Sequence, residues 1–92
     1  MGKGITADVG LTIGLDLGEK YSEGCVVDAS GEVVETFRVR TTQAALDRAL
    51  ARFGKARVVM EVGTHSPWAS RRASAQGNDV IVANPTKLSN TP

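Results

Sequence analysis

The chain has 92 residues, of which 41% are hydrophobic and 23% are charged, and this composition predicts a single soluble globular domain. No apolar run approaches the ~20 residues that a membrane-spanning helix needs, and residues 1–10 lack the apolar segment of a secretion signal. One cysteine, Cys25, fits a reducing cytoplasm, so we expect a cytoplasmic protein without a membrane partner. The formal net charge of +1 neither favours nor excludes nucleic-acid binding.

The first half of the chain has the pattern of three consecutive strands. Residues 1–10 show little pattern and are expected to form a flexible N-terminal arm. Residues 11–18 (LTIGLDLG) predict a short buried strand that ends at Asp16 and a glycine turn. Residues 22–28 and 32–40 are two more strands, and the tight turns between all three predict an antiparallel meander. In the third strand one apolar face is expected, made of Val33, Phe37 and Val39.

The second half alternates helices with strands. Residues 41–54 carry apolar side chains at helical spacing, with a threonine cap at the start and Gly54 at the end. Residues 56–62 form a continuous apolar run that is typical of a strand covered on both faces. Residues 63–77 predict a second helix with Ser66 as its N-cap and Pro67 at its first position, and a fifth strand follows.

The predicted order of elements is therefore β-β-β-α-β-α-β. A helix between two buried strands implies a right-handed crossover and a parallel strand pair. This is the order of a ribonuclease H-like mixed α/β sheet, in which the first strand lies centrally and pairs with both halves. Residues 11–92 are expected to form one such domain, although other mixed α/β domains share the same order.

Two carboxylates end strands that would be neighbours in this sheet. Asp16 ends the first strand and Glu61 ends the fourth, so both would face one crevice at the carboxyl ends of parallel strands. Two adjacent carboxylates repel unless a cation or proton lies between them, and hard oxygen ligands suit Mg²⁺ or Mn²⁺. Such ions could clamp a phosphodiester during in-line displacement. The simpler alternative is that Asp16 is a turn residue and that Glu61 pairs with an arginine.

A different chemistry is compatible with the same elements. The segment IGLDLG followed by a hairpin is also similar to the first phosphate loop of actin-like and heat-shock-protein ATPases, where backbone amides cradle phosphates. Those loops usually carry small hydroxylated residues after the glycine, whereas Gly18 is followed by Glu19, Lys20 and Tyr21. An acid at this position would lie near the phosphates, which makes the fit poor.

Longer segments resemble a known family. IGLDLGEKYSEGCVVDASGEVV, followed by VVMEVGTHSPWASRRASAQGNDVIVANPTKLSN, is similar to the N-terminal, RuvC-like catalytic domain of DEDD transposases, the insertion-sequence family related to Piv invertases. The resemblance covers about Thr12 to Asn90. It implies that Asp16 and Glu61 are the first two acids of a catalytic site for Mg²⁺ or Mn²⁺ and that the intact, prokaryotic protein recombines DNA. It also implies a possible structured, guide-like RNA partner.

The resemblance places two further aspartates, in a D-x-x-D arrangement, soon after Lys87, and a serine-bearing transposase half beyond them. Because the sequence stops at Pro92, we expect a truncated domain that binds Mg²⁺ weakly and performs no strand transfer alone. With only two helices, apolar sheet surface should be bare, and this favours a homodimer or higher oligomer.

Three basic residues are candidate nucleic-acid contacts, namely Arg71, Arg72 and Lys87. Arg38 and Arg40 on the third strand are weighed in the same way, since edge strands often carry charge to discourage pairing. Solvated helix charge is the commoner explanation for such residues. His65 could line the metal crevice, but the segment GTHSP is also a typical turn and cap. Two alternative functions thus accompany the ATPase: a RuvC-like Holliday-junction resolvase or nuclease domain, and a non-catalytic nucleic-acid-binding or dimerisation module.

Overall fold

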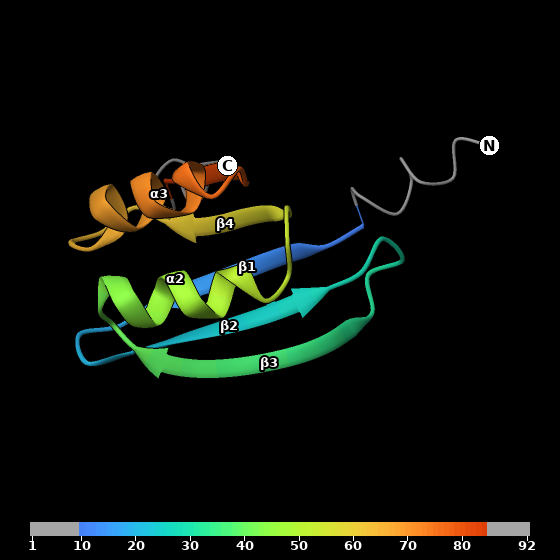
Figure 1. Cartoon of the computed structure of the whole chain (residues 1–92), viewed down its shortest axis with the longest axis horizontal. Coiled ribbons are helices and arrows are strands. Elements are labelled where there is room, and N and C mark those ends of the chain that lie inside the picture. The colour runs from blue at the N-terminus through green and yellow to red at the C-terminus, as the bar shows by residue number, and fades with distance from the viewer. Residues whose placement is uncertain (1–9, 85–92) are drawn as a thin grey trace, which may run out of the picture.

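The computed structural model describes residues 10–84, which form a five-stranded mixed sheet with two helices packed on one of its faces (Figure 1). The elements are β1 (Thr12–Leu17), β2 (Tyr21–Val27), β3 (Val33–Arg40), α2 (Gln43–Ala51), β4 (Arg57–Glu61), α3 (Ser66–Ala75) and β5 (Asp79–Ala83). The predicted order β-β-β-α-β-α-β is therefore confirmed. The expected N-terminal arm and Lys87 lie outside the described residues.

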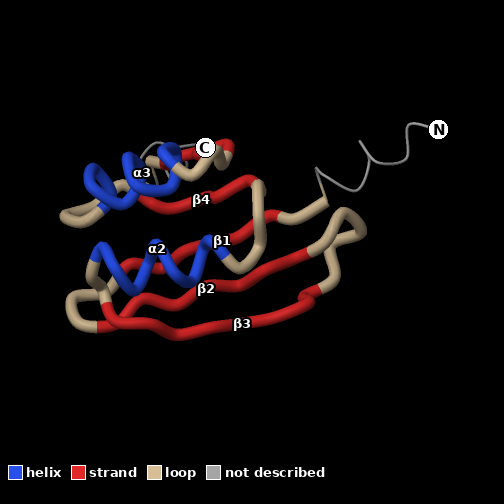
Figure 2. Tube along the Cα trace, in the orientation of Figure 1, coloured by secondary structure: helices blue, strands red, loops and turns tan. Residues whose placement is uncertain are grey.

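The strands are ordered β3-β2-β1-β4-β5, so the first strand is central (Figure 2). It pairs antiparallel with β2 and parallel with β4, and β4 pairs parallel with β5. The meander thus supplies one half of the sheet and the two crossovers supply the other. This arrangement confirms the ribonuclease H-like topology that the element order predicts.

Alternation along the strands separates a core face from an open one. Ile13 and Leu15 of β1 and Met60 of β4 are almost completely buried, and they pack against the apolar sides of α2 and α3. The helices contribute Leu46, Leu50, Ala69 and Ala73 to this core. Fully burying each large aliphatic side chain contributes about 1.5–3 kcal/mol, so this interface is the main source of stability.

The opposite side of the sheet, here called the open face, presents the residues that alternate with the core. They are Arg38 and Thr36 of β3, Glu23 and Cys25 of β2, Asp16 and Gly14 of β1, Val59 of β4 and Ile81 of β5. The fourth strand was predicted to be covered on both faces, but among residues 10–84 no helix covers Val59. The expected dimer remains a prediction.

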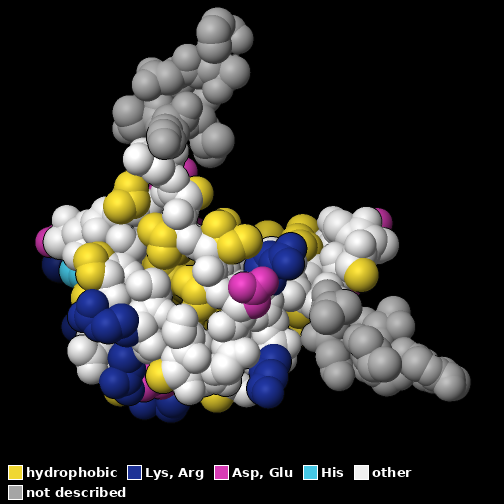
Figure 3. Space-filling view, turned by 90° about the horizontal axis from the view of Figure 1, so that it is seen from above, with side chains coloured by type: hydrophobic (Ala, Val, Ile, Leu, Met, Phe, Trp, Pro, Cys, Tyr) yellow, Lys and Arg dark blue, Asp and Glu magenta, His cyan; other side chains and the backbone are white. Residues whose placement is uncertain are grey.

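Viewed from the side of α3 and β5, exposed hydrophobic side chains lie between charged ones (Figure 3). Near this edge Val62, Ile81 and Val82 are each about half exposed. None of the described helices is long and apolar enough to cross a membrane.

Helix ends follow the predicted signals with two differences, the first being that α2 ends at Ala51 with Arg52 as its C-cap, so Gly54 lies beyond the cap. Thr42 caps α2, and its hydroxyl accepts a hydrogen bond of 3.2 Å from the amide of Ala45. Before α3, however, Ser66 is already the first helical residue and His65 occupies the N-cap position. The Ser66 hydroxyl bonds instead to the backbone of Gly63, at 3.0 Å to both its amide and its carbonyl. Ser66 therefore closes the turn before the helix rather than capping it.

The expected apolar face of β3 is wrong at Val33. The register between β2 and β3 shifts at Val26/Val27, so that Val26 pairs with Glu35 and Val27 pairs with Val33. Such a bulge leaves one extra residue unpaired and re-aims the side chains beyond it. Val33 is consequently 58% exposed, while Phe37 packs against the core.

An ion pair joins the two helices. Arg72 of α3 donates hydrogen bonds to the carboxylate of Asp47 on α2. The hydrogen bond and the positive charge of Arg72 hold the pKa of Asp47 below its usual value, and the same contact raises the pKa of Arg72. Arg72 is thus paired with Asp47 on the helix side of the sheet.

Gly24 of β2 is covered by an aromatic ring from the neighbouring strand. It pairs with Phe37, whose ring in turn stacks on Phe53 with centroids 6.0 Å apart. A Cβ atom added at Gly24 would lie 2.1 Å from the Phe37 ring, whereas one added at Gly14 would meet nothing within 4 Å.

We therefore expect Gly24→Ala to lower the free energy of unfolding by about 1–3 kcal/mol, because the ring must leave its packed position. Gly14→Ala is the matched control and should be neutral or slightly stabilising, since it adds no clash and reduces the freedom of the unfolded chain. Urea denaturation of the two variants measures both effects. Equal stability of the two variants would contradict the packing described.

Candidate metal site

Asp16 and Glu61 lie on adjacent parallel strands at equivalent positions. The pairing of β1 with β4 runs from Thr12 with Arg57 to Leu15 with Met60, so Asp16 and Glu61 are the next residues of the two strands. Both are exposed, and both alternate with core residues that face the helices. The predicted adjacency of the two acidic strands is therefore confirmed, and their side chains belong to the open face.

Neither carboxylate has a hydrogen-bond or ion-pair partner among residues 10–84. The arginine partner that the simpler alternative assigns to Glu61 is thus absent from this part of the chain. Asp16 is the fifth residue of a six-residue strand, so it is not a residue of the glycine turn either. Neighbouring strands lie about 4.8 Å apart, and two unpaired like charges on such neighbours favour a bound cation.

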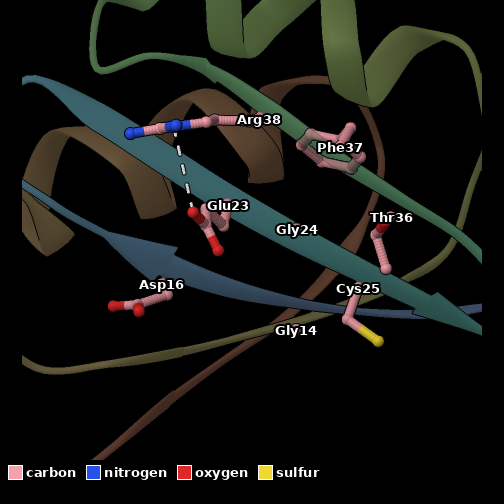
Figure 4. Close-up of a pocket in the computed structure, with 8 residues that line it drawn as sticks. All are labelled: Gly14, Asp16, Glu23, Gly24, Cys25, Thr36, Phe37 and Arg38. Atoms are coloured by element: carbon pink, nitrogen blue, oxygen red, sulfur yellow. Dashed lines mark ion pairs between the residues drawn. The ribbon is translucent and has the colours of Figure 1, made fainter.

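A third carboxylate, Glu23, lies beside Asp16 on the other neighbouring strand. Register pairs Asp16 with Glu23 and Glu23 with Arg38, which makes a row of three residues across the open face. The Glu23 carboxylate points toward Arg38, with Oε2 3.8 Å from Nε, while Asp16 projects separately from β1 (Figure 4). These residues line a cavity of about 470 Å³ together with Gly14, Cys25 and Thr36.

The loops that follow the two acids contact each other. His65, in the loop after Glu61, has its Nε2 atom 3.6 Å from a carboxylate oxygen of Glu19, in the turn after Asp16. Its Nδ1 atom accepts a hydrogen bond of 3.1 Å from the indole N–H of Trp68. The Nε2 atom of His65 is buried and makes no hydrogen bond to residues 10–84, so the two loops lie close together without a hydrogen bond through this atom. Trp68 packs against the core as a structural residue.

The three predicted basic contacts are not gathered at this site. Arg71 and Arg72 belong to α3, which covers the core face, on the opposite side of the sheet from Asp16 and Glu61. Arg72 is also paired with Asp47. Arg71 is exposed and remains a candidate on a separate surface, while Lys87 lies outside the described residues.

The described residues supply only part of a metal site. Asp16 and Glu61 offer hard oxygen donors, the type that Mg²⁺ and Mn²⁺ prefer. However, no group of three or more His, Cys, Asp or Glu residues within residues 10–84 is arranged to hold a metal ion. The two carboxylates fit a hard divalent cation as partial ligands, and further ligands must come from water, substrate or residues outside this range.

Comparison with known families shows which family the chain belongs to. Residues 13–91 match the family described as DEDD_Tnp_IS110, Transposase. The chain belongs to this transposase family. The expected resemblance is thereby confirmed over nearly its full extent. No curated protein matches the sequence.

A solved structure supports the fold of this transposase domain. The RuvC structure of Thermus thermophilus is similar with a TM-score of 0.57 and 19% sequence identity. The match covers 82% of this chain and 62% of the RuvC chain, so the transposase domain spans less than two thirds of that structure. The fold is RuvC-like, and the ATPase interpretation of IGLDLG is not supported by either comparison.

Glu23 is the residue beside the candidate metal site that the sequence analysis does not single out, and Arg38 enters that analysis only as a charge on an edge strand. The position of Glu23 follows from the β1–β2 hairpin, because the Gly18 amide bonds to the Tyr21 carbonyl at 3.1 Å and fixes the β1–β2 register. Asp16 and Glu23 stand opposite each other once that turn is known. The register of the β1–β2 hairpin therefore predicts that Glu23 lies beside Asp16.

Crowding of like charges predicts the behaviour of the metal-free protein. Asp16→Asn should raise the free energy of unfolding by up to about 0.5 kcal/mol, because it removes repulsion with Glu23 and Glu61 across neighbouring strands. Thermal unfolding in EDTA measures this effect, and Glu32→Gln, in an exposed turn, is the control for a general charge effect. A destabilised Asp16→Asn variant would show that Asp16 has a structural partner instead.

Proposed function

We propose that this chain is the metal-binding portion of the catalytic domain of a DNA transposase, and that Asp16 and Glu61 are two of its cation ligands. The observation that carries the proposal is the placement of two unpaired carboxylates at equivalent positions of adjacent parallel strands. The family match supports the assignment of this pair to phosphodiester chemistry on DNA.

In this proposal each residue of the site has a defined role. Asp16 and Glu61 hold the cation at the carboxyl ends of β1 and β4, and the two loops that follow them lie close together, with His65 Nε2 3.6 Å from a carboxylate oxygen of Glu19. A divalent cation bound there would neutralise charge on a phosphodiester and act as a Lewis acid. The exposed position of both carboxylates leaves room for a DNA strand on the open face.

The partners of the intact recombinase are part of the same proposal. DNA is the substrate, a structured RNA is a further partner that pairs donor and target, and a second copy of the protein completes a homodimer or larger assembly. The protein acts in the prokaryotic cytoplasm. On its own this chain would bind metal weakly, because two carboxylates are an incomplete ligand set for an octahedral ion.

The test is Mn²⁺ binding, followed by electron paramagnetic resonance of the free ion. We expect one weak site, with a dissociation constant on the order of millimolar, and a loss of affinity of at least about tenfold in Asp16→Asn or Glu61→Gln. The matched control is Glu32→Gln, which removes an exposed carboxylate on the turn between β2 and β3. Unchanged Mn²⁺ affinity in both site variants would refute the metal assignment and favour a non-catalytic binding module.

A further inference from the structure

The end of the open face near the β1–β2 turn carries a compact cluster of two arginines and a tyrosine. Arg38 and Arg40 are alternate residues of β3, and register pairs Arg40 with Tyr21 of β2. The Arg38 Cζ atom lies 4.6 Å from the centroid of the Tyr21 ring, and the Arg40 Cζ atom lies 5.7 Å from it. We call these three residues the Tyr21 cluster.

The Tyr21 cluster adjoins the acidic pair. Asp16, Glu23 and Arg38 form one row across three adjacent strands, and Tyr21 with Arg40 forms the next row on the same face. With neighbouring strands about 4.8 Å apart, the backbones of Asp16 and Arg38 are separated by about 10 Å. A polymer with regularly spaced phosphates could therefore reach the acids and the cluster at once.

The cluster holds surplus positive charge. Arg40 has no carboxylate partner among residues 10–84, and Arg38 has only Glu23, at 3.8 Å and with both side chains about two thirds exposed. An ion pair at that exposure contributes little. Two guanidinium groups that converge on one ring repel each other, and an anion placed between them would relieve this repulsion.

The geometry of the stack leaves the guanidinium groups ready for phosphate. The ring face of Tyr21 attracts the cations, while the N–H donors of arginine lie in the guanidinium plane and stay available at its edge. Arginine binds phosphate oxygens in a bidentate manner with such donors. The Tyr21 ring is 42% exposed, which also allows an unstacked base to lie against it.

Protection of a sheet edge is the other explanation for charges on β3, which is an edge strand. In that case the side chains would shield the free backbone groups of the edge. Here both guanidinium groups lie over Tyr21 on the inner neighbouring strand, so they cover the face of the sheet.

We propose that the Tyr21 cluster binds the backbone of a single DNA strand, on the same face as Asp16 and Glu61, at phosphates next to the one presented to the metal site. Arg38 and Arg40 contact the phosphates, and Tyr21 positions both guanidinium groups. The proposal rests on the proposed function, because it takes the acidic pair to mark where the reacting phosphodiester lies. It moves the nucleic-acid contact from α3 to the open sheet face.

The test measures binding of a fluorescein-labelled single-stranded DNA oligonucleotide by fluorescence anisotropy, in EDTA and at several salt concentrations. The double variant Arg38→Gln/Arg40→Gln should weaken binding about tenfold and lower the slope of log K against log salt by about 1.4, the value for two lost phosphate contacts on a single strand. Tyr21→Leu should also weaken binding, whereas Tyr21→Phe should retain it, because the ring face is the feature that matters.

One variant is expected to gain affinity. Glu23→Gln removes the carboxylate that competes for Arg38 and should strengthen DNA binding by about twofold to threefold. A gain of this kind cannot arise from misfolding. The matched control is Arg48→Gln, which changes an exposed arginine of α2 on the helix side of the sheet, and its affinity should equal that of the wild type.

Several results would overturn the proposal. One is wild-type affinity in the Arg38→Gln/Arg40→Gln variant. If this variant also aggregated more, the two arginines would be assigned to protection of the sheet edge. Others are a larger loss in Arg71→Gln, binding of RNA but not of DNA of the same sequence, and no binding by the wild-type protein. Mn²⁺ affinity of the same samples separates the two proposals: if it still depends on Asp16 and Glu61, only the DNA contact has failed.

Discussion

The central position of β1 is the constraint on which the rest of the structure depends. This strand pairs with β2 in one direction and with β4 in the other, and both pairings are in continuous register. Side chains alternate strictly along a strand. Burial of Ile13 and Leu15 in the core therefore places Gly14 and Asp16 on the open face. A one-residue slip would bury Asp16 and expose the core, so hydrophobic burial itself holds the acid in place.

The two faces of the sheet therefore have different tasks. The core face carries both helices, the aromatic packing of Phe37 on Gly24 and the ion pair between Asp47 and Arg72, all of which stabilise the fold. The open face carries Asp16 and Glu61 without partners among residues 10–84, next to the Tyr21 cluster. Unpaired charge on this face lowers the stability of the isolated domain. It is also the feature expected of a surface that binds a cation and a phosphate backbone.

Much of this could be predicted from the sequence. The apolar period changes after Arg40, and the order of strands and helices then places the first strand beside the fourth, so Asp16 and Glu61 become neighbours before any coordinate is known. Some helix limits also follow from local signals, such as Thr42 at the start of α2 and the left-handed Gly77 directly after the C-cap of α3. These features are local in sequence or follow from chain topology.

What could not be predicted depends on pairing between distant residues. The bulge at Val26/Val27 re-aims Val33, and no local pattern marks it. Which face α3 covers decides that Arg71 lies away from the acids, and a helical pattern alone does not reveal this. The stacking of Arg38 and Arg40 on Tyr21 requires the register of β2 and β3, since in the sequence these arginines are only alternate charges on a strand.

The central claim is that a divalent cation binds at the carboxyl ends of β1 and β4 on the open face. It is tested most directly by adding a small amount of Mn²⁺ to the ¹⁵N-labelled protein and recording which amide signals broaden. The account predicts that the amides around Asp16 and Glu61 broaden first, while those around Arg48 on α2 and Ser30 in the β2–β3 turn stay sharp. Broadening centred elsewhere, or spread evenly over the exposed acids, would contradict it.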